Sequence, residues 1–182
     1  MGISLDGWER DLKRITILAA LLGSALGALQ VQAQAQAQES AIPADLSAPG
    51  DQVALTLQLD GMQLFECKRV AGKLTWTSNG QRAALYKDGA IVGNYSNGPT
   101  WRHNDGSSLS GKLVTSKDAP TPKDYPWQRF DVTARGQGAF SDVTAVVQID
   151  TQKGLLQGPC EDETVASGQP FRATYVFLKT KK

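Results

Sequence analysis

The stretch GPTWRHNDGSSLSGK, residues 98–112, contains the only histidine of the chain among residue types that hydrolases use. His103 could act as a general base with Asp105 behind it, and Ser107 or Ser108 could then be the nucleophile. However, the Asn-Asp-Gly run between them has the residue types that tolerate positive φ in a turn. We therefore interpret the stretch as a hairpin turn and expect no catalytic residue. This favours a protein that is not an enzyme.

Metal and nucleotide sites are not expected either. A transition-metal site needs three or four converging ligands, and a single histidine without a C-x-x-C spacing does not supply them. The acidic run at 161–163 lacks the ligand spacing of a calcium loop. The segment GQGAFS (136–141) begins like a dinucleotide fingerprint but continues into a strand pattern, whereas the fingerprint requires a helix. We expect no metal and no cofactor.

The tryptophans are the remaining candidates for contact with a ligand. Trp76 is expected in the core, because it follows the alternation of its strand. Trp101 shares a strand face with His103, and Trp127 stands among polar neighbours. Such mixed faces can line a cleft that stacks against a sugar or an aromatic ligand; the alternative, which ordinary packing favours, is that each tryptophan covers an end of the core. We predict Trp101, His103 and Trp127 as ligand-binding residues.

The elements that must position these residues are strands. Apolar residues alternate with polar ones in QVALTLQL (52–59), and similar short runs recur along the chain, separated by turn signals such as Asp88-Gly89 and Asn97-Gly98. Asp60-Gly61 is either a hairpin turn or a glycine bulge within one long strand. The pattern predicts a single all-β domain of about eight or nine antiparallel strands, folded as a β-sandwich or a β-barrel.

The N-terminus predicts a secretory signal peptide over residues 1–35. Basic residues between positions 10 and 14 precede an uncharged run over 15–29, and Ala-Gln-Ala at 33–35 offers a small-residue cleavage site. A membrane span needs about 20 apolar residues, so this run is short for one, and an uncleaved anchor is the alternative. We expect a secreted or periplasmic protein with no membrane span after cleavage.

The rest of the chain is expected to form one domain behind a linker. Residues 36–51 begin with a Gln/Ala alternation and predict a flexible, low-complexity lead-in. Residues 52–182 are long enough for one all-β domain with its own core. The formal net charge of the whole chain is +1, and such a near-neutral protein lacks the basic surface that binds nucleic acid.

Cys67 and Cys160 are the only cysteines. In an oxidising compartment an even pair usually forms a disulfide, and a loop of this length would stabilise the fold by about 4–5 kcal/mol in the chain-entropy model. The bridge would tie an early strand to the loop that precedes the last strand. A reactive thiol or a metal ligand is the alternative.

Several motifs follow the order and rough spacing of a known secreted family. They are GMQLFEC (61–67), GPTW (98–101), DGSSLSGK (105–112), YPW (125–127), GAFSDVTAVVQIDT (138–151) and GPC (158–160). Together they resemble the family of secreted domains of unknown function numbered 3455, from about Val53 to Phe177. The similar cysteine pattern supports the bridge between Cys67 and Cys160. The resemblance implies the fold and export, but no activity.

Two functional hypotheses follow. The leading one is an exported, non-enzymatic β domain that binds a small molecule or a glycan in a tryptophan-lined cleft. The alternative is a protein-interaction module of the cell envelope or secretome, such as a hydrolase inhibitor. A pocket that contains Trp101 would favour the first, and a large exposed apolar patch would favour the second.

Overall fold

The structure is a computed structural model that describes residues 41–181. Within this range a short 3-10 turn, η1 (Ala44–Leu46), precedes eight strands. The strands are β1 (Asp51–Val70), β2 (Lys73–Lys87), β3 (Ala90–Ser96), β4 (Thr100–His103), β5 (Ser108–Lys117), β6 (Trp127–Arg135), β7 (Ala145–Lys153) and β8 (Ala166–Thr180). The predicted signal peptide, residues 1–35, lies outside the described residues.

The eight strands form one closed antiparallel barrel in chain order, with β8 paired to β1. The all-β prediction is confirmed, and of its two architectures the barrel is the one observed. Within the barrel, closure removes the sheet edges that an open sheet would expose. Across residues 41–181, no helix has the length and apolar character needed to cross a membrane.

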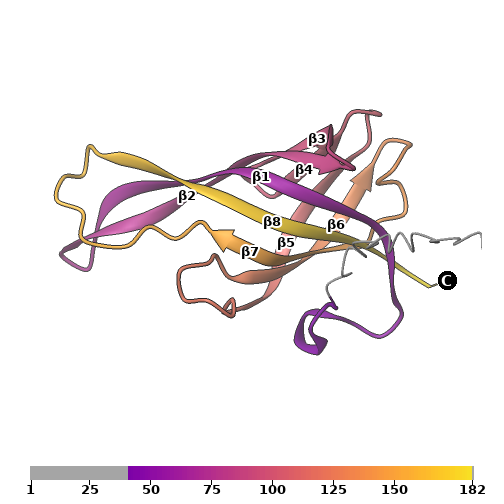
Figure 1. Cartoon of the computed structure of the whole chain (residues 1–182), viewed down its shortest axis with the longest axis horizontal. Helices are drawn as coiled ribbons and strands as arrows, with labels where there is room; N and C mark the ends of the chain where they lie inside the picture. Colours follow the sequence, from indigo (N-terminus) through magenta and orange to yellow (C-terminus); the bar gives the residue numbers. More distant parts are fainter. Residues whose placement is uncertain (1–40, 182) are drawn as a thin grey trace, which may run out of the picture. The chain divides into compact units, whose positions relative to one another are not determined.

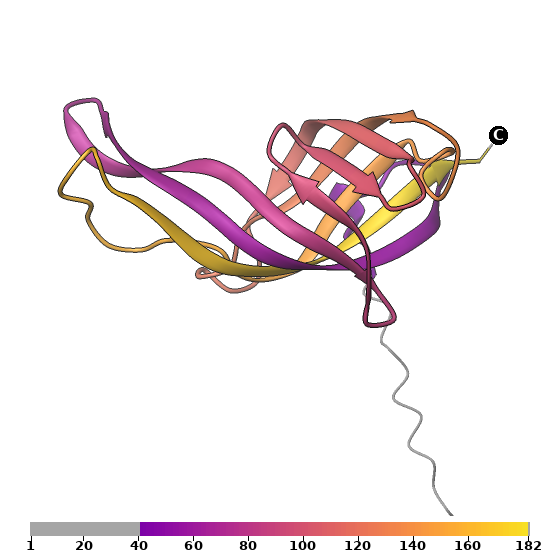
Figure 2. The same ribbon diagram turned by 90° about the horizontal axis from the view of Figure 1, so that it is seen from above.

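Three strands extend well beyond the others (Figures 1 and 2). β3 pairs with β2 only from Arg82 onward, and β8 pairs with β7 only from Phe171 onward, whereas β1 continues to pair with both β2 and β8. We call this three-stranded extension the arm; it consists of residues 62–70, 73–81 and 166–170. The barrel therefore has an arm end and, opposite to it, a far end.

Two glycines that follow turn-forming residues lie inside strands. Asp60-Gly61 lies inside the continuous strand β1, so of the two alternatives the hairpin is wrong. A Cβ on Gly61 would lie 2.2 Å from the Arg82 carbonyl oxygen, so glycine permits this close approach of two strands. Asn79-Gly80 has the residue types of a turn signal, but it lies within β2 at a register irregularity, where Gly80 takes a φ of 95°.

The core has two parts, one on each side of the barrel wall. The interior cluster is rich in aromatic side chains, among them Trp101, Tyr175, Phe140 and Phe177, all of them fully buried. The second cluster lies on the other face of β7 and β8, because side chains alternate between the two faces of a strand. Its members are Leu46, Ala145, Val147, Ile149, Val176 and Leu178.

The segment before β1 packs against the barrel in its described part. Leu46 of η1 is fully buried in the second cluster, and its carbonyl accepts a hydrogen bond of 3.0 Å from the Arg129 guanidinium. Arg129 also forms an ion pair of 2.7 Å with Asp51. Since both charged side chains are largely buried, this pair fixes the start of β1 on the outer wall of the barrel.

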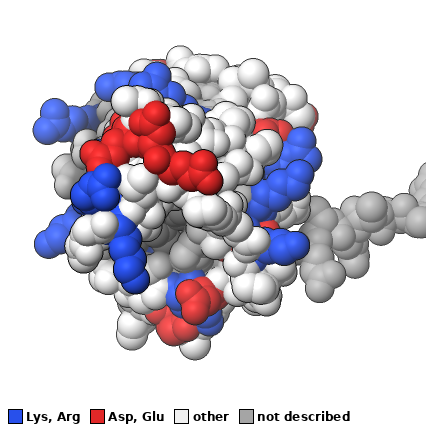
Figure 3. All heavy atoms as spheres, turned by 90° about the vertical axis from the view of Figure 1, so that its left-hand side faces the viewer, with Lys and Arg blue, Asp and Glu red and all other residues white. Residues whose placement is uncertain are grey.

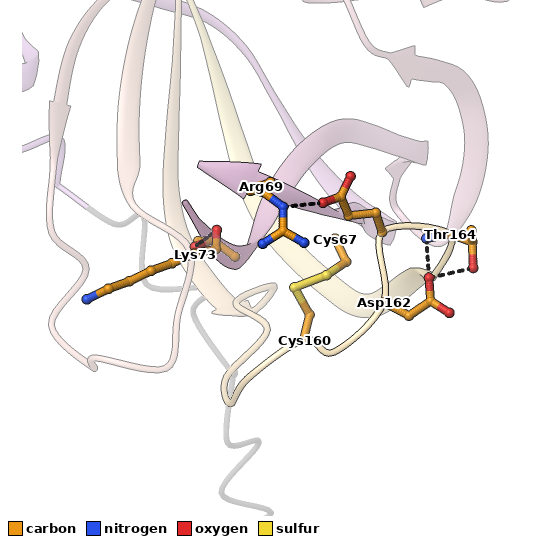
Figure 4. The surroundings of a disulfide bond; sticks show 8 residues. Cys67, Arg69, Lys73, Cys160, Asp162 and Thr164 are labelled. Carbon is orange, nitrogen blue, oxygen red and sulfur yellow. Dashed lines mark hydrogen bonds and ion pairs between the residues drawn. A yellow bond between two sulfur atoms is a disulfide. The ribbon is translucent and has the colours of Figure 1, made fainter. Parts of the chain in front are cut away.

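The predicted disulfide between Cys67 and Cys160 is confirmed, with an S–S distance of 2.11 Å and a Cα–Cα distance of 5.8 Å. It joins the arm part of β1 to the β7–β8 loop, and the Arg69–Glu163 ion pair of 2.8 Å lies beside it (Figure 4). The N–H of Cys67 also donates to the carbonyl of Val165. The arm is therefore fastened covalently to a loop that is distant in the sequence.

Candidate functional site

The stretch that contains His103 forms the turn between β4 and β5, as predicted. Asp105 is the hub of this turn: it accepts hydrogen bonds from the Ser107 hydroxyl (2.6 Å), the Ser107 N–H (2.9 Å) and the Ala139 N–H (2.7 Å). His103 Nδ1 lies 2.9 Å from Asp105 Oδ2. The serine hydroxyl thus donates to the aspartate, which is not the nucleophile-to-base order of a hydrolase triad.

These hydrogen bonds to Asp105 hold two loops together at the far end of the barrel. They connect the β4–β5 turn to the β6–β7 loop, from which Phe140 enters the interior and stacks on Phe177 with ring centroids 4.8 Å apart. His103 meets the same Phe140 ring edge-on at 5.4 Å. The hydrogen bonds from Ser107 and Ala139 hold the pKa of Asp105 well below its ordinary value. The residues that first suggested catalysis therefore close one end of the barrel.

The three predicted ligand-binding residues are not neighbours around one cleft. Trp101 lies fully buried inside the barrel, 5.1 Å from Tyr95 and 5.7 Å from Tyr175 between ring centroids. Trp127 packs against the second cluster on the outer face, and His103 lies at the far end. Trp76, which was expected in the core, is only partly buried, because it lies on the arm.

A different set of polar residues gathers where the arm leaves the barrel. Gln63 of β1 lies directly opposite Gln81 of β2 and opposite Gln169 of β8, so the three side chains form one row across the sheet. We call Gln63, Gln81 and Gln169 the glutamine row. By strand alternation it belongs to the same face as Leu57 and Leu59, which point into the barrel. The row therefore faces inward at the arm end.

Two members of the glutamine row are buried with unused hydrogen-bonding capacity. Gln63 is 0% exposed and Gln81 is 5% exposed. The Gln63 amide nitrogen donates to the Ser78 hydroxyl (2.7 Å) and to the Gly80 carbonyl (3.1 Å). The Oε1 atoms of Gln63 and Gln81 have no hydrogen-bond partner among the described residues. A buried acceptor without a partner costs about 1–3 kcal/mol, so these two oxygens are acceptors that a bound molecule can satisfy.

The surroundings of the glutamine row are aromatic and uncharged. On the barrel side, the Tyr175 hydroxyl donates to Gln148 Oε1 at 3.0 Å, and Gln148 in turn donates to the Pro126 carbonyl. Burial raises the pKa of Tyr95 to about 12 and raises that of Tyr175 well above its ordinary value, so both hydroxyls stay neutral. On the arm side, Phe65 occupies the next inward position of β1 and is buried.

Charge is absent from this interior as far as the structure describes it. Arg129 is the one charged side chain among the buried residues of the described range, and it lies on the outer wall with Asp51. Figure 3 looks at the arm end: charged side chains lie around its margin, and the atoms around the hollow in its middle are mostly uncharged. A charged ligand would find no counter-ion there, so the site suits a neutral molecule.

The alternation of β1 contains a sequence signal for this site. Gln63 continues the inward alternation of Leu57 and Leu59, and a polar residue at a core-facing position needs an explanation. Because Asp60-Gly61 was also compatible with a turn, the alternation could not be extended across it. The position of Gln81 opposite Gln63 depends on the register of two strands, which the sequence alone does not give.

One comparison identifies relatives of the chain. A family model described as "Protein of unknown function (DUF3455)" matches residues 86–179. The chain belongs to this family. The matched DUF3455 segment runs from the end of β2 into β8 and includes Trp101 and Cys160, whereas Gln63, Cys67 and Gln81 precede it. Searches of curated proteins and of solved structures found no match.

Proposed function

We propose that this DUF3455 protein is an exported, non-enzymatic β domain that binds a small uncharged molecule at the glutamine row. The observation that carries the proposal is the pair of buried, unpartnered Oε1 atoms of Gln63 and Gln81. Two acceptors side by side call for a ligand with hydrogen-bond donors, such as a polyol, a sugar or a neutral amide. The mouth of a small barrel is a common place for such a site.

The predicted role of Trp101 changes within this proposal. Trp101 does not line an open cleft but supports the inner wall through its contacts with Tyr95 and Tyr175. His103 and Trp127 lie elsewhere and take no part in the proposed site. The alternative function, a protein-interaction module, stays a prediction.

Export is part of the proposal and is supported by two independent features. The N-terminal basic and apolar pattern is typical of a signal peptide. The Cys67–Cys160 disulfide is typical of an oxidising compartment such as the periplasm or the extracellular space. Mass spectrometry of the protein isolated from its host tests this directly, with an expected N-terminus near residue 36 and two fewer hydrogens than the dithiol form.

A thermal-shift screen with neutral polyols, monosaccharides and small amides tests the binding site. Gln81→Leu removes an acceptor that makes no other hydrogen bond in the structure, so we expect this variant to fold and to lose the ligand-induced rise in melting temperature. Gln58→Leu is the matched control, because Gln58 lies on the exposed face of the same sheet. A ligand that stabilises both variants equally, or a panel without any stabilising compound, would contradict the proposal.

A further inference from the structure

The inner face of the arm continues outward from the glutamine row as a second contact surface. The next inward positions hold Ser78, Phe65 and Ser167, and the position after that holds Trp76 opposite Cys67. Polar and aromatic side chains thus alternate along one face of three paired strands. We call the face that bears Gln63, Phe65 and Trp76 the arm face.

Trp76 is the aromatic side chain of the arm face that is open to contact. It is partly exposed, whereas Phe65 is only 6% exposed. Cys67, which lies opposite Trp76, is four positions along β1 from Gln63, and at 3.3 Å per residue this distance is about 13 Å. One small ligand cannot touch both the glutamine row and Trp76, but an elongated one can.

We infer that the ligand is a neutral, linear oligosaccharide, bound with one end at the glutamine row and with a sugar ring farther along stacked on Trp76. This inference rests on the proposed function. Hydroxyl groups are the donors that the two glutamine oxygens lack, and a pyranose ring presents an apolar C–H face that suits an indole. The absence of charge among the inward-facing buried residues of the described range favours a neutral glycan over an acidic one.

The disulfide gives this surface the rigidity that such a site requires. Cys67 lies directly opposite Trp76 and is bonded to Cys160 of the β7–β8 loop. β1 is therefore held by pairing with β8 and by the covalent link, and β2, the arm strand that carries Trp76, pairs directly with it. A platform fixed before binding loses little conformational entropy when the ligand docks.

Isothermal titration of the disulfide-bonded protein with a graded series of sugars tests the inference. The probes are glucose, cellobiose and cellotetraose, with N-acetylglucosamine and chitotetraose as a second series. We expect the affinity for one tetrasaccharide to exceed that for its monosaccharide by roughly tenfold, the usual size of one additional aromatic contact. Trp76→Ala should erase this gain and leave the monosaccharide affinity unchanged, and Trp76→Phe should keep most of it.

Each outcome assigns success or failure to one of the two proposals. Thr75→Ala, on the opposite, exposed face of the same strand, controls for general damage to the arm. Affinity that does not depend on chain length, or on Trp76, overturns the oligosaccharide inference, as does the absence of binding to every sugar. If a neutral compound that is not a sugar then binds, and this binding depends on Gln81, the proposed function is kept and the oligosaccharide inference is rejected. Oligosaccharide binding that survives Gln81→Leu would instead overturn the proposed site.

Discussion

At the scale of single residues, burial decides the role of each polar side chain. Gln148 and Gln63 are both 0% exposed, but Gln148 uses its amide oxygen on Tyr175 whereas Gln63 leaves its oxygen without a partner. The first residue completes a network inside the barrel, and the second offers an acceptor. Polar groups of the same type thus have different consequences according to what lies within 3.5 Å of them.

Asp105 should stabilise the fold in a pH-dependent way. Its pKa is lowered in the folded protein, so its contribution is fully present above the unfolded value near 3.8 and is lost as the pH falls through the lower folded value. We expect Asp105→Asn to lower the melting temperature at pH 7, with the difference from the wild type shrinking below about pH 4. Thermal melts from pH 2 to pH 8 measure this. Asp118→Asn, in the exposed β5–β6 loop, is the control, and a difference that does not change with pH would contradict the account.

Gln81 should be dispensable for folding although it is buried. Its Oε1 atom has no partner among the described residues, so replacing the residue with leucine removes a desolvation penalty instead of a bond. We expect the free energy of unfolding of Gln81→Leu to stay within about 1 kcal/mol of the wild type or to rise. For Gln63→Leu we expect a loss, since Gln63 bonds Ser78 and the Gly80 carbonyl. Urea denaturation of the two variants compares them, and the reverse order would count against this assignment.

At the scale of elements, the barrel is closed differently at its two ends. The far end is filled by Phe140, which is fully buried and stacks on Phe177. The arm end carries a row of polar side chains and a loop fixed by the disulfide. The arm end is therefore the end at which polar side chains, and not a stacked aromatic pair, face inward, and it is where the proposed ligand would bind.

Phe140 should be one of the residues on which stability depends most. We expect Phe140→Ala to lower the free energy of unfolding by about 3–5 kcal/mol. Removal of the buried aromatic ring leaves a cavity that the β6–β7 loop, held in place by Asp105, cannot fill. Val114→Ala serves as the control, since Val114 is 53% exposed. Chemical denaturation followed by tryptophan fluorescence measures both. A cost for Phe140→Ala as small as for the control would show that the loop does not plug the barrel.

The disulfide should stabilise the arm more than the barrel. We expect Cys67→Ser combined with Cys160→Ser to lower the free energy of unfolding by about 2–5 kcal/mol. Hydrogen exchange should accelerate in residues 62–70 and 73–81, because the Cys67–Cys160 bond fastens this part of the arm to the β7–β8 loop. An arm that exchanges as slowly in the variant as in the wild type would contradict this role.

The element pattern was largely predictable from the sequence, and the site was not. Alternation and turn signals predicted the all-β class and the approximate number of strands. The presence of just two cysteines predicted the disulfide between them. Closure into a barrel depends on β8 meeting β1, a long-range register that local patterns do not contain. The glutamine row depends on the same kind of register, because Gln63, Gln81 and Gln169 are far apart in the chain.

At the scale of the whole molecule, the described domain combines a filled barrel with an arm that extends the sheet beyond it. The barrel supplies stability through its two apolar clusters, and the arm supplies a surface whose side chains are not needed for the core. This division agrees with a binding protein in which the scaffold and the site are separate parts. Trp101 belongs to the scaffold, and Trp76 belongs to the site.

The central claim is that a neutral ligand occupies the glutamine row, and side-chain NMR tests it most directly. Titration of the ¹⁵N-labelled, disulfide-bonded protein with the most stabilising compound of the thermal-shift screen reports on each glutamine amide and each indole N–H. We predict shifts for the side chains of Gln63 and Gln81, with those of Gln58 and Trp127 unchanged. Shifts confined to Trp127 or to the far end around His103, with Gln63 and Gln81 unmoved, would contradict the claim.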